Sequence, residues 1–138
     1  MDTTGVASQL TEQAARLIAD GRGSEAEPLL REAMADLERS SDRPSPQLVD
    51  VTQSLARLLI SRGEGAEATT MFERSLAMKR QLLGPNHPQL AIQLHDWALL
   101  CDRYGWTDQA RMLWTEAEAL LDLSEAPAGA SDARDEAS

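Results

Sequence analysis

The sequence predicts an all-α protein of three helix–turn–helix units, with about six helices in all. Two observations support this fold class. Helix-forming residues such as Ala, Leu, Glu, Gln, Arg and Met dominate the composition, whereas aromatic residues make up only 4%. The chain also overlays itself without a gap when it is shifted by 42 residues, which is typical of repeat architectures.

Four columns of this repeat are identical in all three units. They comprise one glycine column and three alanine columns: Gly21, Gly63 and Gly105; Ala14, Ala56 and Ala98; Ala26, Ala68 and Ala110; Ala35, Ala77 and Ala119. Each glycine lies between two helical segments, where a residue without a Cβ can adopt the left-handed conformation that ends a helix. We therefore expect one helix before and one helix after each glycine.

The expected helices follow the chain in order. The first helix of each unit is expected at about 6–19, 46–61 and 88–103, and the second at about 25–38, 66–83 and 108–121. Ser45 before Pro46 predicts a capped helix start, and Gly84 predicts the end of the longest helix. Ser24 with Glu27 matches a capping box, while Pro28 in the first turn predicts that its helix begins late.

We expect a single domain over residues 6–123, divided into repeats at about 6–44, 45–86 and 87–123. The first five residues, 1–5, are expected to be flexible. Residues 124–138 contain no large apolar side chain and are expected to form a disordered acidic tail.

The repeat columns resemble the tetratricopeptide repeat. Its motif has small, apolar, Ala, bulky and small residues at fixed distances from the glycine, and the matching residues here are Ala14, Leu17, Ala26, Leu30 and Ala33; Ala56, Leu59, Ala68, Phe72 and Ser75; Ala98, Cys101, Ala110, Trp114 and Ala117. The 42-residue period and the Gly-Pro-x-His-Pro linker at residues 84–88 are similar to the kinesin-light-chain subtype and to bacterial repeat proteins. The resemblance implies a right-handed superhelix, a solenoid in which the first helices line a concave groove.

The same resemblance implies a protein–protein interaction module, an adaptor whose groove binds a peptide or a partner helix. The groove columns in the second and third units hold Asp50, Gln53, Arg57, Ile60 and Ser61, then Ile92, His95, Asp96, Leu99, Asp102 and Arg103. In the first unit they hold Thr11, Ala15 and Ile18. The alternative interpretation of these charges is a solvated face with local ion pairs.

The charge balance disfavours two classes of partner. The chain has 23 acidic and 13 basic residues, a net charge of −10. Nucleic acid and anionic membranes are bound through Lys and Arg, so neither is expected as a partner. The single cysteine, Cys101, excludes an internal disulfide, and the absence of a signal-peptide pattern favours the cytoplasm.

No catalytic motif is present, and we expect no enzyme activity, cofactor or metal site. His87 is interpreted as a capping or turn residue, and Cys101 as a buried hydrophobe. Trp97 and Trp114 are expected in the core, whereas Trp106 either covers the end of the bundle or anchors a partner.

A second hypothesis is a self-assembling structural unit, a homo-oligomer formed through an uncapped terminal repeat. In that case the leucines of the last helix would meet another chain: Leu113, Leu120 and Leu121.

Overall fold

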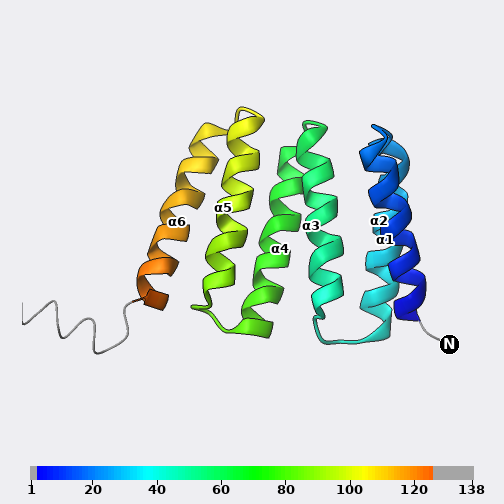
Figure 1. Cartoon of the computed structure of the whole chain (residues 1–138), viewed down its shortest axis with the longest axis horizontal. Coiled ribbons are helices and arrows are strands. Elements are labelled where there is room, and N and C mark those ends of the chain that lie inside the picture. Colours follow the sequence, from blue (N-terminus) through cyan, green and yellow to red (C-terminus); the bar gives the residue numbers. More distant parts are fainter. Residues whose placement is uncertain (1–2, 126–138) are drawn as a thin grey trace, which may run out of the picture. The chain divides into compact units, whose positions relative to one another are not determined.

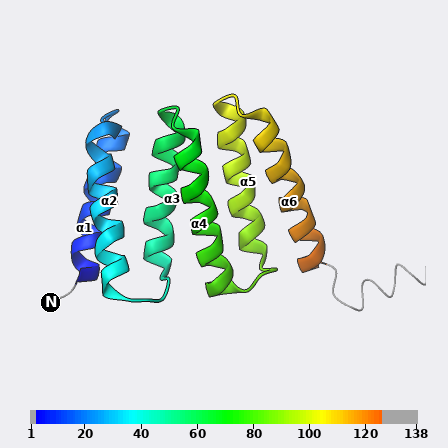
Figure 2. The same ribbon diagram turned by 180° about the vertical axis from the view of Figure 1, so that it is seen from behind.

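The computed structural model describes residues 3–125. Six helices follow one another in this part of the chain, and it contains no strand: α1 (Thr3–Ala19), α2 (Gly23–Ser40), α3 (Pro46–Ser61), α4 (Gly65–Leu83), α5 (Pro88–Arg103) and α6 (Thr107–Glu125) (Figures 1 and 2). The all-α prediction is therefore confirmed. The chain forms two compact units, Met1–Leu82 and Leu83–Ser138, which we call the N-terminal and the C-terminal unit.

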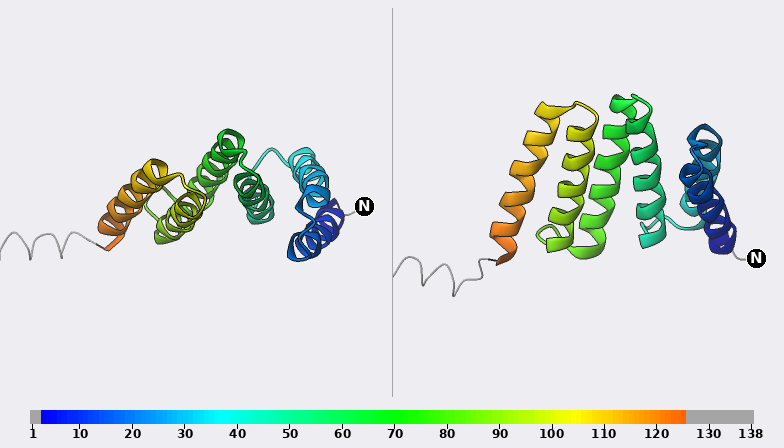
Figure 3. Two further views of the ribbon diagram at one scale, coloured as in Figure 1. Left: turned by 90° about the horizontal axis from the view of Figure 1, so that it is seen from above. Right: turned by 45° about the horizontal axis from the view of Figure 1, so that its top comes forward.

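The N-terminal unit has two faces. Its helices α1 and α2 pack against each other, and α2 also packs on α3. Seen from above, α1 and α3 lie on one side of the unit, while α2 and α4 lie on the other (Figure 3, left). We call these sides the α1/α3 face and the α2/α4 face.

The alanine columns let the helices of the N-terminal unit approach closely. Ala14, Ala26 and Ala56 are fully buried, and Leu55 and Phe72 fill the space around them with at most 2% of their surface exposed. Burial of such apolar surface is the main source of stability for a repeat that cannot cover its own apolar face.

In the C-terminal unit, α5 packs against α6. Trp97 and Cys101 on α5 are buried at 2% and 1% exposure, and Ala110 and Leu113 on α6 are buried as well. The predictions for Trp97 and Cys101 are therefore confirmed. Trp114 is only half-buried.

The glycine turns have the expected left-handed backbone. Gly21, Gly63 and Gly105 have φ values of 78°, 79° and 86°. After each glycine the next N–H donates back to a carbonyl five residues earlier, as in Arg22 N to Leu17 O at 2.7 Å. This bond closes the end of the first helix and aims the chain into the second. Gly84, with φ 97°, ends α4 as expected.

Two helix starts agree with the sequence prediction. The Leu48 N–H donates to Ser45 Oγ at 3.1 Å, and the Gln89 N–H donates to His87 Nδ1 at 3.1 Å. His87 is thus a capping residue. Each of these caps stands directly before a proline at the first helical position, which fixes where the helix begins.

The predicted start of α2 is wrong in two respects. The capping residue is Arg22, without a side-chain cap, so Ser24 and Glu27 form no capping box. Pro28 lies inside α2, which begins five residues earlier at Gly23. Pro28 has no N–H and cannot donate a helical hydrogen bond. The helix tolerates this loss because Ala26 and Leu30, on either side, are buried in the core.

The described helices reach further toward both termini than expected. α1 begins at Thr3, so residues 3–5 belong to this helix, and α6 continues to Glu125. Residues 126–138 of the predicted tail lie outside the described part of the chain.

Candidate functional site

The α1/α3 face contains a hollow of about 300 Å³. Side chains from two helices line it: Ser8, Thr11, Glu12 and Ala15 from α1, and Gln47, Asp50 and Val51 from α3. The spacing of three and four residues within each set puts its members on one side of their helix. The hollow is therefore built from two regular helical faces, not from a loop.

The hollow is supported by a buried side chain and is fixed at one end by a hydrogen bond. Val51 is fully buried, which leaves Ala15 as the exposed apolar residue of the lining. At one end the Gln47 Nε2 donates to Ser8 Oγ at 2.8 Å, which ties α3 to α1. The Thr11 Oγ1 donates to the Ala7 carbonyl at 2.7 Å, so its hydroxyl proton is used within α1.

Ala15 explains why the hollow exists in this unit. The equivalent positions of the second and third repeats carry the long side chains of Arg57 and Leu99. Ala15 is exposed and has only a methyl group, which leaves the space between the two helices unfilled. The hollow is a property of the first repeat beside the second.

Two carboxylates, Glu12 and Asp50, stand at this hollow, and both residues are exposed. No Lys or Arg lines it. Within residues 3–125, neither carboxylate takes part in an ion pair. The hollow therefore carries negative charge that the described chain does not neutralise.

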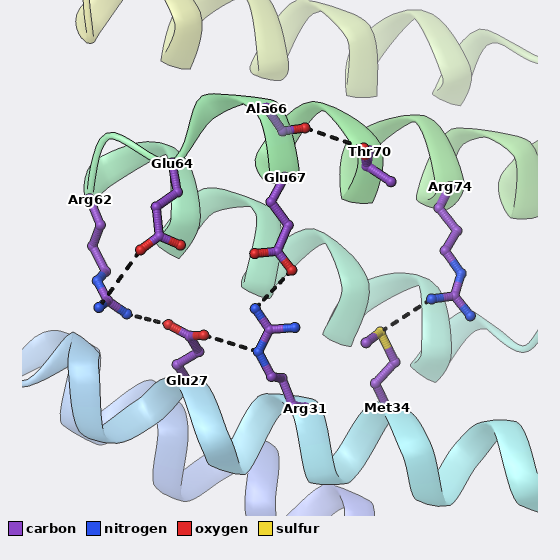
Figure 4. Close-up of polar contacts among 9 residues, drawn as sticks. All are labelled: Glu27, Arg31, Met34, Arg62, Glu64, Ala66, Glu67, Thr70 and Arg74. Atoms are coloured by element: carbon purple, nitrogen blue, oxygen red, sulfur yellow. Dashed lines mark hydrogen bonds and ion pairs between the residues drawn. The ribbon is translucent and has the colours of Figure 1, made fainter.

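On the α2/α4 face, several carboxylates form ion pairs with arginines of this chain (Figure 4). Arg31 on α2 donates to Glu27 Oε2 at 3.0 Å and to Glu67 Oε2 on α4 at 2.9 Å. Arg62, in the turn before α4, pairs with Glu27 and lies 3.9 Å from Glu64 Oε1. We call this run of alternating charges, Glu64–Arg62–Glu27–Arg31–Glu67, the ion-pair ladder.

The ladder joins the first repeat to the second. The hydrogen bond between Arg31 on α2 and Glu67 on α4 is the main reason why the pKa of Arg31 is raised. Further along the same face, Arg74 Nη2 lies 2.6 Å from Glu38 Oε2, and its Nη1 lies 3.9 Å from Met34 Sδ (Figure 4). Such partly exposed pairs contribute about 0.2–1 kcal/mol each, so the ladder is a supplement to the apolar core.

A second hollow, of about 390 Å³, lies where the α2–α3 connection meets α4. Its lining mixes both signs of charge: Glu38, Ser41, Asp42, Arg43, Pro44, Leu48, Arg74, Met78 and Gln81. Because Arg74 and Glu38 already pair with each other, this hollow offers no dominant charge to a partner.

The predicted groove residues of the N-terminal unit separate into three groups. Thr11, Ala15 and Asp50 line the hollow. Other predicted residues lie outside its lining, with Gln53 half-buried and the rest exposed: Ile18, Gln53, Arg57 and Ser61. Ile60 is only 2% exposed, and its assignment to the groove surface is wrong. Leu58 and Leu59 beside it are buried too, because this end of α3 is covered around most of its circumference.

In the C-terminal unit, the predicted groove residues form an exposed stripe on α5. Ile92 and Leu99, seven residues apart, are 59% and 49% exposed. The polar members of the set are exposed as well: His95, Asp96, Asp102 and Arg103. The His95 ring meets Trp114 of α6 edge to face, with 4.3 Å between ring centroids, so it covers one side of this half-buried tryptophan.

Sequence reasoning missed four residues of the hollow. Ser8 occupies the repeat column of Asp50, and Glu12 occupies the column of Asp96. Applying those two groove columns to the first repeat would have found both residues. Gln47 and Val51 lie outside the predicted columns, because their role depends on how α1 and α3 approach each other.

The other chemically distinctive residues carry no site. Burial raises the pKa of the Cys101 thiol, which keeps it protonated and unreactive at neutral pH. Among the described residues, no group of three or more His, Cys, Asp or Glu side chains could hold a metal ion. Trp106 is 37% exposed in the turn before α6.

The fold and the site together define a helical-hairpin repeat protein. A family model described as Tetratricopeptide repeat matches residues 50–89, which supports a tetratricopeptide repeat protein. Such repeats are in general non-catalytic scaffolds that mediate protein–protein interactions. A comparison with curated proteins finds no match. Over the described residues, none of the helices has the length and apolar character needed to cross a membrane.

Proposed function

We propose that this protein is an interaction module, an adaptor that binds a segment of a partner protein in the hollow between α1 and α3. The observation that carries the proposal is the hollow itself, in which the exposed methyl group of Ala15 lies among polar side chains of α1 and α3. Binding sites commonly combine apolar contact with a few placed polar atoms. We further propose the kinesin-light-chain-like subtype, which the linker at residues 84–88 supports.

The hollow is suited to one or two side chains of a bound segment rather than to a whole domain. Its volume of about 300 Å³ is at the lower end of the range for ligand sites. Both walls are helices, and the Gln47–Ser8 hydrogen bond fixes their spacing at one end. A site that is already formed loses less free energy on binding, because few groups have to be ordered.

The α2/α4 face is a weaker candidate for the same role. Its arginines Arg31, Arg62 and Arg74 already bind carboxylates of this chain. A charged partner on that face would have to replace these pairs, so the net gain in electrostatic free energy would be small.

Self-assembly through α6 is less well supported than the adaptor role. Leu113, one of the three leucines expected to meet another chain, is buried at 3% exposure, so that expectation is wrong for it. Glu118 also occupies the repeat column where Met34 and Leu76 are buried at 8% and 5% exposure. A carboxylate in that column disfavours stacking of a further apolar helix there, because burying it without a partner is costly.

The proposal is tested by filling the hollow. Peptides would be selected from a displayed random library on the wild-type protein and then measured against Ala15→Trp, which puts an indole where the hollow is open. Ala77→Trp, the same change at an exposed position of α4, is the matched control.

We expect a class of peptides that loses at least about tenfold in affinity on Ala15→Trp, a loss of about 1.4 kcal/mol, and that binds the control like wild type. Unchanged melting temperatures would show that both variants are folded. If every selected peptide binds Ala15→Trp as well as wild type, the hollow is not the binding site.

A further inference from the structure

We infer that the hollow between α1 and α3 selects a basic segment, with a Lys or Arg side chain held between Glu12 and Asp50. This inference rests on the proposed function and adds to it the chemical class of the partner. It is drawn from the charges and hydrogen-bonding groups of the hollow, not from its volume.

Charge complementarity is the first argument. Both charged side chains that line the hollow are carboxylates, and neither has a cationic partner among residues 3–125. The carboxylates of the ladder, Glu27 and Glu67, by contrast, each face an arginine of this chain. Two carboxylates that share a hollow and have no cationic partner among the described residues create a local negative potential, and that potential attracts a positive group.

Hydrogen-bonding capacity is the second argument. Glu12 and Asp50 can only accept hydrogen bonds when ionised. The Thr11 hydroxyl has already donated its proton to the Ala7 carbonyl, so toward a ligand it too can only accept. Lys and Arg are the side chains that carry several donors and no acceptor, which makes them the match for these three acceptors, away from the end that Ser8 and Gln47 close.

The shape of the side chain fits as well. Lys and Arg combine an apolar stem with a charged head, and they commonly bury the stem while the head stays at the surface. The exposed methyl group of Ala15 provides the apolar contact for the stem. The exposed carboxylates at the rim then meet the head without the full cost of burying an ion pair.

The same features exclude an acidic segment. Its carboxylates would meet Glu12 and Asp50 in a hollow that has no Lys or Arg in its lining. Like charges placed opposite each other disfavour a wrong partner, so the hollow discriminates by repulsion as well as by attraction.

The test uses the peptides whose binding depends on the hollow, as defined by Ala15→Trp. Each peptide is made in three forms that carry Lys, Gln or Glu at its basic positions. Binding is measured with the full chain as wild type, as Glu12→Gln/Asp50→Asn and as Glu32→Gln/Glu73→Gln. The last variant removes the same net charge from exposed positions of α2 and α4 and is the matched control.

We expect hollow-dependent peptides to be enriched in Lys and Arg and to bind in the order Lys, Gln, Glu. Removing Glu12 and Asp50 should weaken the Lys form by about two- to thirtyfold, as expected for two partly exposed pairs, and should leave the Gln form unchanged. The control should change the affinity by less than about twofold, because more distant exposed charges are screened.

Two results would overturn the inference and would be distinguishable from a failure of the proposed function. Hollow-dependent peptides without basic residues would show that the site binds a different class of segment. An equal loss in both charge variants would show that only the net charge of −10 attracts the peptide. If no peptide depends on the hollow at all, the proposed function fails and the inference fails with it.

Discussion

The α1/α3 face and the α2/α4 face of the N-terminal unit carry similar side chains but pair them differently. On the α2/α4 face, Glu27 and Glu67 are neutralised by Arg31 (Figure 4). On the α1/α3 face, Glu12 and Asp50 have no such partner within the described chain. The comparison shows that a net negative charge is not informative by itself. What assigns a role to each carboxylate is the residue that lies opposite it.

The largest expected effect concerns the core beneath both faces. Phe72, on the helix that carries Glu67, is 2% exposed, whereas Trp114 in the C-terminal unit is only half-buried. Phe72→Ala should lower the free energy of unfolding by about 3–5 kcal/mol, and Trp114→Ala should lower it by less although Trp is larger. Chemical denaturation measures both. A larger loss for Trp114→Ala would mean that Trp114 is covered in solution, for example by a second chain.

Charge reversal on the two faces should have unequal effects on stability. Arg31→Glu places three carboxylates together with Glu27 and Glu67, and we expect a loss of about 1–2 kcal/mol. Glu12→Lys reverses a charge that has no ion-pair partner among residues 3–125, and we expect a change within about 0.5 kcal/mol. Thermal and urea unfolding of the two variants would compare them directly. Equal losses would show that the ladder is not a specific structural element.

The turn that leads from one face to the other should be sensitive to a single methyl group. Gly63 connects α3 to α4 with φ 79°, and nothing lies within 4 Å of where its Cβ would be. Gly63→Ala should therefore cost about 1 kcal/mol, from the left-handed backbone alone. Chemical denaturation would measure the free energy of unfolding of Gly63→Ala. Ala66→Gly, at an exposed position of α4, would be measured beside it for comparison. Unchanged stability of Gly63→Ala would mean that the turn can relax.

The smallest expected effect is a difference between the two faces in how salt changes the stability of the protein. High salt screens the attraction within the ladder, so it should reduce the stability of wild type by less than about 1 kcal/mol. Arg31→Met should lose part of this salt dependence, whereas Glu12→Gln should keep it. The measurement is the urea midpoint at low and high salt. The same salt dependence in wild type and Arg31→Met would show that the ion pairs of Arg31 do not contribute measurably to stability.

The sequence was sufficient for the fold because the repeat columns report packing directly. Small residues such as Ala14 and Ala56 recur wherever two helices touch, and Gly21 recurs wherever a first helix ends. The start of α2 was missed because Ser24 resembles a cap in sequence. Ser45 is followed by a proline that fixes the helix start, and Ser24 is not.

The site was only partly predictable. The groove columns correctly placed Thr11, Ala15 and Asp50 at the hollow, whereas Ile60, which they placed on the groove surface, is buried. The ladder could not be foreseen, because Arg31 and Glu67 are 36 residues apart and meet only through the packing of α2 beside α4. A column describes one position of a repeat, and it does not say which side chains of neighbouring repeats face each other.

The most direct test of the central claim is an NMR titration of isotopically labelled wild-type protein with a hollow-dependent peptide in its Lys form. We expect the largest amide shift changes on α1 and α3 at the hollow, around residues 8–15 and 47–51. We also expect these changes to disappear with the Glu form and in Ala15→Trp. Largest changes on the ladder helices α2 and α4, or on α5, would contradict the claim that the hollow is the binding site.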